Sequence, residues 1–351
     1  MLGLKRKSIF IDESKIGALL NDCDVTDSKK IKIFIFDSER KPCSEVNNER
    51  KDIGCASENK ICKSVAEYCT SQAVVLCSFK INSYKLKTKS INQKLVHKSY
   101  YLQDIYQYLK EKERNNCPLP TYILRQPWIS LSSRNIVIDA LIYVTYVLEF
   151  DDNVLFLSVY YLDRFLSLVF VKGTKLAAVG FACLFIASKY EEATTDRLED
   201  FVPFMKNICT KKEICEIERK ILKTLGFDIS GPTTCFFLEC ICSTMEVSDA
   251  IFFFALFILE MTLMEPDSFL KFLPSKLAAS ALVVATNMLD IPFCEKMLQT
   301  SSGYSQTDTN TCCKLLRKLY RKFISRPRRS IYEKYKSSDY LRVADLHTNV
   351  M

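Results

Sequence analysis

Residues able to do chemistry are scarce in this chain of 351 residues. The only two histidines, His97 and His347, lie too far apart in the sequence for a common local site, and no Cys-x-x-Cys pair repeats at zinc-finger spacing. We find no glycine-rich phosphate loop, no Ser/His/Asp arrangement and no carboxylate pair at a known catalytic spacing. The sequence therefore predicts a protein that is not an enzyme and that uses neither a metal nor a cofactor.

Four charged residues lie next to or within apolar segments. By themselves, Arg134 and Asp163 are most simply two solvated surface charges; if buried, they would have to be paired, because an unpaired buried charge is costly. Lys189 ends an apolar segment, where its stem could pack on the core while its ammonium reaches water, and Glu218 is an isolated helix charge. The residues alone leave these alternatives open.

The elements that hold these residues are predicted to be helices. The hydrophobic fraction is 48%, with only 8 Gly and 10 Pro, which favours long uninterrupted helices over turn-rich sheets. The two most apolar stretches, residues 176–188 and 251–259, are shorter than the ~20 residues that span a bilayer, so no membrane contact is expected. Cysteines such as Cys183, Cys235 and Cys240 lie in apolar stretches and are expected to be reduced core residues.

The first 98 residues are predicted to be a disordered, basic, regulatory tail. Residues 1–100 carry 19 Lys or Arg against 12 Asp or Glu and lack a sustained 3.6-residue pattern. The cluster Lys5-Arg6-Lys7 could assist nuclear import or could be a plain solvated charge cluster.

A short docking helix and a linker are expected over residues 99–131. Tyr101, Ile105 and Tyr108 recur there at helical spacing on one apolar face. Pro118 and the prolines that follow it should stop the helix and favour an extended crossing segment.

The rest of the chain reads as two groups of five helices, at 132–229 and 230–326, followed by an extension at 327–351. Lys-Leu-Ala-Ala occurs at 175–178 and again at 276–279, each time opening a long helix of small and apolar residues. This self-similarity predicts a duplicated five-helix unit with one central helix in each copy. The expected helices are near residues 134–149, 153–168, 175–190, 196–206, 210–225, 233–244, 247–264, 273–289, 291–299 and 308–324.

Two five-helix repeats after a docking helix resemble the tandem cyclin-box fold, and local motifs make the resemblance specific. Tyr161-Leu-Asp-Arg-Phe-Leu-Ser167 resembles the second-helix signature of the cyclins, Ala187-Ser-Lys-Tyr-Glu-Glu192 the end of the third helix, and the stretch from Leu222 to Phe227 the end of the fifth. Leu270-Lys-Phe-Leu-Pro-Ser275 and the tail Ser330-Ile-Tyr-Glu-Lys-Tyr-Lys-Ser-Ser-Asp-Tyr340 favour the mitotic A type.

The resemblance implies a regulatory subunit that binds and activates a cyclin-dependent serine/threonine kinase in cell-cycle control, from S phase to mitosis. It implies that Arg134 and Asp163 form a structural pair between the first two helices, and that Lys189 and Glu218 bond to the main chain of the mobile regulatory helix of the kinase. The apolar positions that it assigns to kinase binding are Tyr190, Leu222, Phe227, Ile229, Tyr101, Ile105 and Tyr108.

The chain departs from the A-type pattern at the groove that docks Arg-x-Leu motifs. The large and charged side chains of that groove are replaced, so we expect it to be weak or absent, with a shallow apolar strip at Ile136 and Val137. The replacements are Ser133, Ala140, Gly173 and Ala177. Recruitment of ubiquitin-ligase machinery through the tail is expected from the family, yet the only destruction-box-like sequence is the degenerate Arg6-Lys-Ser-Ile9.

Two rival functions remain on this fold. Transcription factors resembling TFIIB share the five-helix repeat, but nearly all of the net charge of +8 lies in the tail, whereas a duplex-binding module concentrates Lys and Arg on its folded surface. Nucleic acid is therefore not an expected partner. A kinase-binding scaffold without activation is the second rival. The resemblance implies localisation in the nucleus and cytoplasm.

Overall fold

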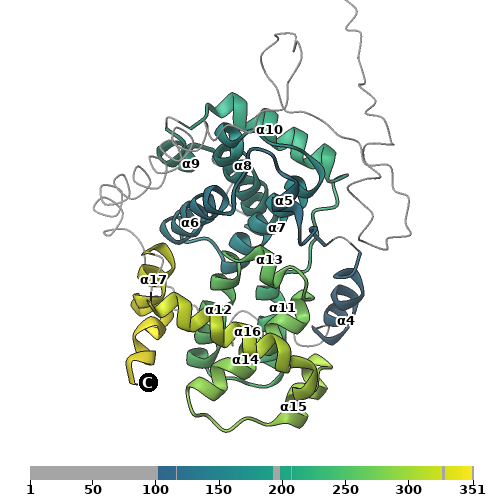
Figure 1. Cartoon of the computed structure of the whole chain (residues 1–351), viewed down its shortest axis with the longest axis vertical. Coiled ribbons are helices and arrows are strands. Elements are labelled where there is room, and N and C mark those ends of the chain that lie inside the picture. The colour runs from purple at the N-terminus through teal and green to yellow at the C-terminus, as the bar shows by residue number, and fades with distance from the viewer. Residues whose placement is uncertain (1–101, 116, 193–197, 207, 326–328, 350–351) are drawn as a thin grey trace, which may run out of the picture. The chain divides into compact units, whose positions relative to one another are not determined.

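The computed structural model describes residues 102–115, 117–192, 198–206, 208–325 and 329–349. These residues form a helical fold (Figure 1), which confirms the predicted all-α class. The helices are α4 (Leu102–Lys112), α5 (Tyr122–Arg125), α6 (Leu131–Val147), α7 (Asp152–Leu168), α8 (Gly173–Glu191), α9 (Leu198–Met205), α10 (Lys211–Thr224), α11 (Thr234–Thr244), α12 (Asp249–Thr262), α13 (Pro266–Phe269), α14 (Pro274–Met288), α15 (Glu295–Ser302), α16 (Gln306–Ser325), α17 (Arg329–Lys336), and the 3₁₀ turns η1 (Ser338–Tyr340) and η2 (Val343–Asn349).

Local capping residues set several helix boundaries. The Ser130 side chain accepts a hydrogen bond from the Ser133 amide, and the Ser133 hydroxyl accepts one from the Ser130 amide, so α6 starts in a capping box. Thr210 and Glu213 form the same arrangement at the start of α10. Gly303 ends α15 with a φ of 74°, a left-handed conformation that suits glycine.

Helix α8 is the central helix of the first repeat. It packs against α6, α7, α9 and α10, and most of its residues are buried. Close approach to α6 depends on Gly180, because a Cβ atom at this position would lie 2.5 Å from Cγ1 of Val137. A residue without a side chain thus allows tight packing of α8 on α6 at this point.

Helix α14 has the same place in the second repeat, since it packs against α11, α12, α15 and α16. It begins at Pro274, whose fixed φ suits the first helical turn, and its buried face is lined with small residues. The two Lys-Leu-Ala-Ala segments thus open the central helices of both groups.

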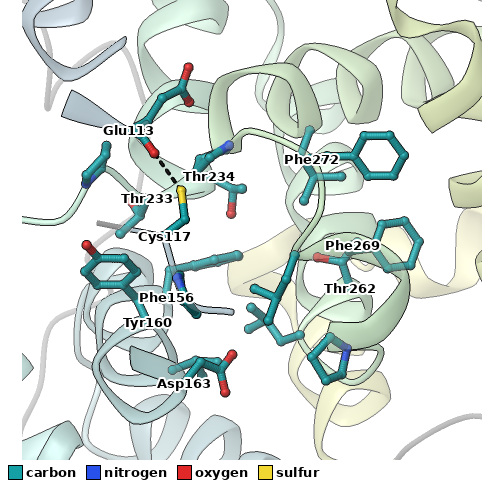
Figure 2. Close-up of a pocket in the computed structure, with 18 of the residues that line it drawn as sticks. Glu113, Cys117, Phe156, Tyr160, Asp163, Thr233, Thr234, Thr262, Phe269 and Phe272 are labelled. Atoms are coloured by element: carbon teal, nitrogen blue, oxygen red, sulfur yellow. Dashed lines mark hydrogen bonds between the residues drawn. The ribbon is translucent and has the colours of Figure 1, made fainter. Parts of the chain in front are cut away.

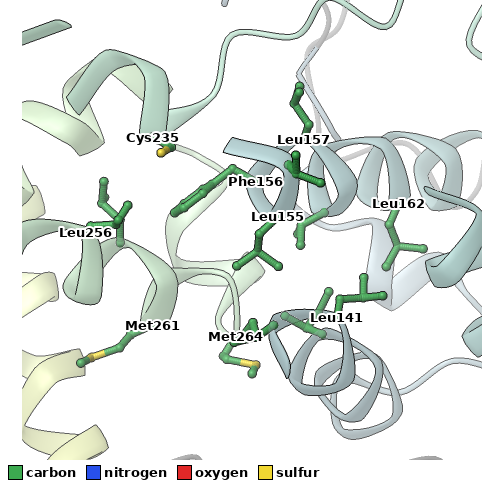
Figure 3. Close-up of a cluster of buried hydrophobic side chains, with 14 of the residues drawn as sticks. Leu141, Leu155, Phe156, Leu157, Leu162, Cys235, Leu256, Met261 and Met264 are labelled. Atoms are coloured by element: carbon green, nitrogen blue, oxygen red, sulfur yellow. The ribbon is translucent and has the colours of Figure 1, made fainter. Parts of the chain in front are cut away.

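Buried side chains from both repeats meet where α6 and α7 approach α11 and α12. Figure 3 shows Phe156 of α7 together with Cys235 of α11, and Leu141 of α6 together with Met264 after α12. All four side chains are at most 6% exposed. The repeats therefore share one continuous apolar core instead of folding around two separate ones.

The segment between the docking helix and the first repeat contains a helical turn that was not expected. An extended crossing segment was expected between the docking helix and the first repeat, but Tyr122–Arg125 forms a one-turn helix, α5. Gln126, which follows it, explains why the turn is stable: its amide donates to the carbonyls of Leu166 and Val169, and its oxygen accepts from the amide of Val171. Tertiary hydrogen bonds thus outweigh the local preference of the prolines.

Candidate protein-interaction surface

Lys189 and Glu218 lie together on the surface of the first repeat. Lys189 is in the last turn of α8 and Glu218 is on α10, and packing between these helices allows Nζ of Lys189 to donate to Oε1 of Glu218. The side chains are 33% and 13% exposed. The Lys189 ammonium also lies 4.3 Å from the ring centroid of Phe185, so its stem is packed while its charged end reaches the surface.

Exposed aromatic and aliphatic side chains are found at the ends of the same two helices and on α4. Tyr190 is 47% exposed and Phe227 66%, while on α4 Ile105 is 36% and Tyr108 60% exposed. Such large apolar groups normally turn inward, and a surface that gathers them beside a few charges has the composition of an interface centre. We call Lys189, Glu218 and these four residues the α4–α8–α10 surface.

The turn after α10 directs Phe227 outward. Gly226 and Phe227 adopt φ values of 65° and 58°, and the Phe227 amide donates to the carbonyl of Leu222 at 2.9 Å. A left-handed conformation is uncommon for a bulky residue and requires support from its surroundings. Leu222 and Ile229, also candidate contact residues, are only partly buried beside it.

Helix α4 is fixed to the rest of the fold by residues that the sequence analysis did not single out. Tyr106 is 2% exposed; its hydroxyl donates to the carbonyl of Ser302 at 2.9 Å, and its ring packs edge-on against Phe237. Lys112 lies 3.5 Å from Asp228, in the segment between α10 and α11. The helix therefore buries Tyr106 and leaves Ile105 and Tyr108 outward, a division that helical periodicity could not assign.

Side chains of α4, of the end of α8 and of the turn after α10 lie close to one another. Burial raises the pKa of Tyr190, and the nearby Glu191 and Tyr108 add to that effect. Lys112 lies 5.9 Å from the ring centroid of Tyr108 and pairs with Asp228, the neighbour of Phe227. The exposed residues of α4 and those at the ends of α8 and α10 thus face one region.

Arg134 and Asp163 lie in the interior, not on this surface. The Arg134 guanidinium makes two hydrogen bonds to the Asp163 carboxylate, at 3.0 and 2.8 Å, and Tyr122 donates to the same carboxylate at 2.5 Å. Burial would lower the pKa of Arg134, but Asp163 and Tyr122 outweigh it, so the pKa is raised. Arg134 also donates to the carbonyl of Leu263 at 2.6 Å, which connects the first repeat to the second.

A second buried ionic cluster was not predicted from the sequence. Lys334 of α17 is fully buried, 3.0 Å from Asp152 at the start of α7 and bonded to Glu260 of α12. Tyr335 donates to Glu260 at 2.8 Å and Tyr340 to Asp152 at 2.7 Å. The C-terminal extension therefore attaches to both repeats. In the sequence, this segment was noted only for its resemblance to the A-type tail. A Lys and two Tyr in a polar stretch do not reveal their partners.

The candidate groove offers little surface. Val137 lies against Gly180, Ser133 is used in the capping box of α6, and Ile136 is half-buried. Five of the six groove positions are buried: Ser133, Val137, Ala140, Gly173 and Ala177. Of the apolar strip expected at Ile136 and Val137, only Ile136 retains exposure.

Some expectations lie outside the described residues. These are the contact of Tyr101, the disorder of the tail, the import cluster Lys5-Arg6-Lys7 and the degenerate Arg6-Lys-Ser-Ile9 sequence. Within the described ranges, no three His, Cys, Asp or Glu side chains gather as metal ligands would. In the same part of the chain, no helix combines the length and apolar character that crossing a bilayer requires.

Known proteins match most of the described chain. Residues 104–230 match the family model described as "Cyclin, N-terminal domain", and residues 232–349 match "Cyclin, C-terminal domain". Cyclin-A1 of Homo sapiens is 36% identical over 255 residues, 73% of this chain and 55% of that protein. G2/mitotic-specific cyclin-A of Spisula solidissima is 36% identical over 249 residues, 71% of this chain and 59% of that protein.

The chain thus spans somewhat more than half the length of these curated relatives. Among solved structures, a viral cyclin from herpesvirus saimiri matches with a TM-score of 0.55 and 20% identity, covering 65% of this chain and 99% of that one. The helical repeats, both family models and the A-type relatives agree: this chain belongs to the cyclin family.

Proposed function

We propose that this chain binds a cyclin-dependent serine/threonine protein kinase and activates it in cell-cycle control between S phase and mitosis. The observation that carries the proposal is the combination, on the α4–α8–α10 surface, of the Lys189–Glu218 pair with exposed apolar side chains. The chain itself contributes no reacting group. Its place of action is proposed to be the nucleus and cytoplasm, and its tail a contact for ubiquitin-ligase machinery.

The ion pair suits recognition of a partner main chain. An ammonium has three N–H donors and a carboxylate has about four acceptor positions, so the bond between Lys189 and Glu218 leaves capacity on both sides. Charged hydrogen bonds to backbone carbonyls and amides hold a helix in place without depending strongly on its side chains. Lys189 would bind carbonyls of the kinase regulatory helix, and Glu218 amides beside it.

The apolar neighbours would supply most of the affinity. Tyr108, Tyr190 and Phe227 are exposed aromatic groups, and aromatic anchors dominate binding free energy in protein interfaces. Because they come from α4, α8 and the turn after α10, the surface is complete only while these elements keep their positions. Binding would favour the kinase conformation with its regulatory helix inward, which completes the catalytic site by a population shift.

A pull-down with purified cell-cycle kinases, followed by histone phosphorylation, tests this proposal. Lys189→Ala and Glu218→Ala are expected to fold and to lose kinase binding and activation. Lys211→Ala is the matched control, because Lys211 forms an exposed ion pair with Glu199 elsewhere on the same repeat. It should behave as wild type.

The alternatives are separated by the same experiment. Binding without histone phosphorylation would indicate a kinase-binding scaffold. A folded wild-type chain that captures no kinase would refute the proposal and direct attention to the nucleic-acid-binding alternative on this fold.

A further inference from the structure

A cavity of about 100 Å³ lies between the two repeats, and none of its lining residues belongs to the α4–α8–α10 surface. Figure 2 shows it bounded by Phe156 and Tyr160 of α7 on one side and by Phe269 and Phe272 on the other. Cys117 of the linker closes one end, where its thiol donates to the carbonyl of Glu113 at 2.7 Å. Both repeats and the linker thus contribute walls.

Most of the wall is apolar. Besides the aromatic rings, the wall includes Val159, Leu263, Leu270 and Leu277 together with several prolines. An apolar protein cavity of roughly 150 Å³ accepts benzene, because transfer of an apolar group out of water is favourable. At about 100 Å³ this cavity is smaller, but it is partly open to solvent, so a single ring need not fit wholly inside it.

The charged side chains of the cavity wall already have hydrogen-bond partners within the protein. Arg134 and Asp163 pair with each other, and both carboxylate oxygens of Glu113 accept bonds from Ser275, at 2.6 Å from its hydroxyl and 2.9 Å from its amide. Burial raises the pKa of Glu113, which further disfavours a net charge there. A charged ligand would lose its hydration without gaining a counter-charge. The wall therefore favours a neutral ligand.

One polar group of the wall remains available. Thr234, the first residue of α11, is half-buried, and within the described residues its hydroxyl has no hydrogen-bond partner. By contrast, Thr233 bonds to Asn153, and Thr262 donates to the carbonyl of Leu259 at 2.6 Å. A hydroxyl or N–H group on a ligand could pair with Thr234.

We propose that this cavity binds a neutral molecule built on one aromatic ring, with a hydroxyl or N–H group that pairs with the Thr234 hydroxyl. The site is distinct from the proposed kinase-binding surface and does not depend on that function. The ring would lie among the apolar side chains of α7 and of the segment around α13, and its polar group would point toward the start of α11.

Binding of four probes to the full chain tests the proposal, measured by calorimetry and by ligand-observed NMR. Phenol and toluene have the same number of heavy atoms, but only phenol carries a hydroxyl; benzoate and benzylammonium add a negative or a positive charge. Phenol and toluene should bind saturably, with dissociation constants on the order of 1 mM or below, as expected for such small ligands. The two charged probes should bind at least about tenfold more weakly.

Substitutions at Thr234 locate the site. Thr234→Phe places a ring in the cavity and should abolish binding of both neutral probes. Thr234→Val keeps the shape without the hydroxyl, so it should weaken phenol binding about threefold to tenfold and leave toluene binding unchanged. Thr224→Val, at a half-buried threonine on α10 outside the cavity, is the matched control and should change neither.

Three results would overturn the proposal: no saturable binding of phenol or toluene to the folded wild type, equal binding of the charged probes, or unchanged binding to a folded Thr234→Phe chain. Should Thr234→Phe not fold, the comparison of phenol with toluene in Thr234→Val decides, and an equal effect on both probes would count against the proposal.

Discussion

Replacing Lys334 with methionine tests how the C-terminal extension holds the two repeats together. The substitution keeps most of the side-chain length and removes the charge that lies between Asp152 and Glu260. All three side chains are at most 6% exposed, so water cannot solvate the two carboxylates that remain. Breaking a buried ion pair by removing one partner costs about 3–5 kcal/mol, and we expect a loss of unfolding free energy of that size.

The loss should depend on pH in a defined direction. Burial already raises the pKa of Glu260 above its usual value of 4.5, and without Lys334 that pKa should rise further. A carboxyl group whose pKa is raised by folding favours the folded state below its unfolded pKa, and this contribution is lost as the pH rises through the folded pKa. The deficit of Lys334→Met relative to wild type should therefore be small near pH 4.5 and increase toward neutral pH.

Urea unfolding followed by circular dichroism, at both pH values, measures this difference. The matched control is Lys322→Met, which removes a lysine that forms an exposed ion pair with Glu265 and should cost less than about 1 kcal/mol. Adding Asp152→Asn and Glu260→Gln to Lys334→Met should recover most of the lost stability, because no buried charge then remains. A deficit below about 1 kcal/mol near neutral pH, or one that does not change with pH, would refute the reasoning.

Four further outcomes are expected. Gly180→Ala should cost about 1–3 kcal/mol in thermal unfolding, because its Cβ would clash with Val137, and adding Val137→Ala should restore part of that loss. Phe227→Ala should leave stability within about 0.5 kcal/mol yet weaken kinase binding about tenfold or more in a titration, and equal affinity would contradict its role as an anchor. Tyr106→Phe should lower stability by about 0.5–1.5 kcal/mol, measured by urea unfolding, since the Ser302 carbonyl loses one of its two donors and keeps the Lys110 ammonium. A labelled Arg-x-Leu peptide should show no saturable binding in fluorescence anisotropy, and tight binding would mean that a groove exists despite the buried positions.

Helix positions could be predicted from the sequence because they depend on local signals. The repeated Lys-Leu-Ala-Ala segments and the apolar periodicity placed α8 and α14 to within about two residues of their observed starts. The short helices α5 and α13 were not predicted, since one helical turn carries too few residues for a periodic pattern. For α5, stability comes from Gln126 and its contacts with distant carbonyls.

The side-chain partners show where sequence reasoning ends. Arg134 and Asp163 became a candidate pair only through a family resemblance, because their separation of 29 residues has no meaning before the helices are packed. Nothing in the sequence indicated that Arg134 also reaches Leu263 in the second repeat, or that Lys334 lies between two carboxylates.

The helical class, the duplication and the residue types available for recognition follow from the sequence, because hydrophobic period and composition are properties of the chain alone. Which side of each helix is buried depends on the fold. It turned Tyr106 inward and left Tyr108 exposed, although both lie in one short helix, and it brought Lys189 and Glu218 together from separate helices. The physical reason is that burial and pairing depend on which surfaces the packed helices present to one another, and that information is shared among residues far apart in the chain.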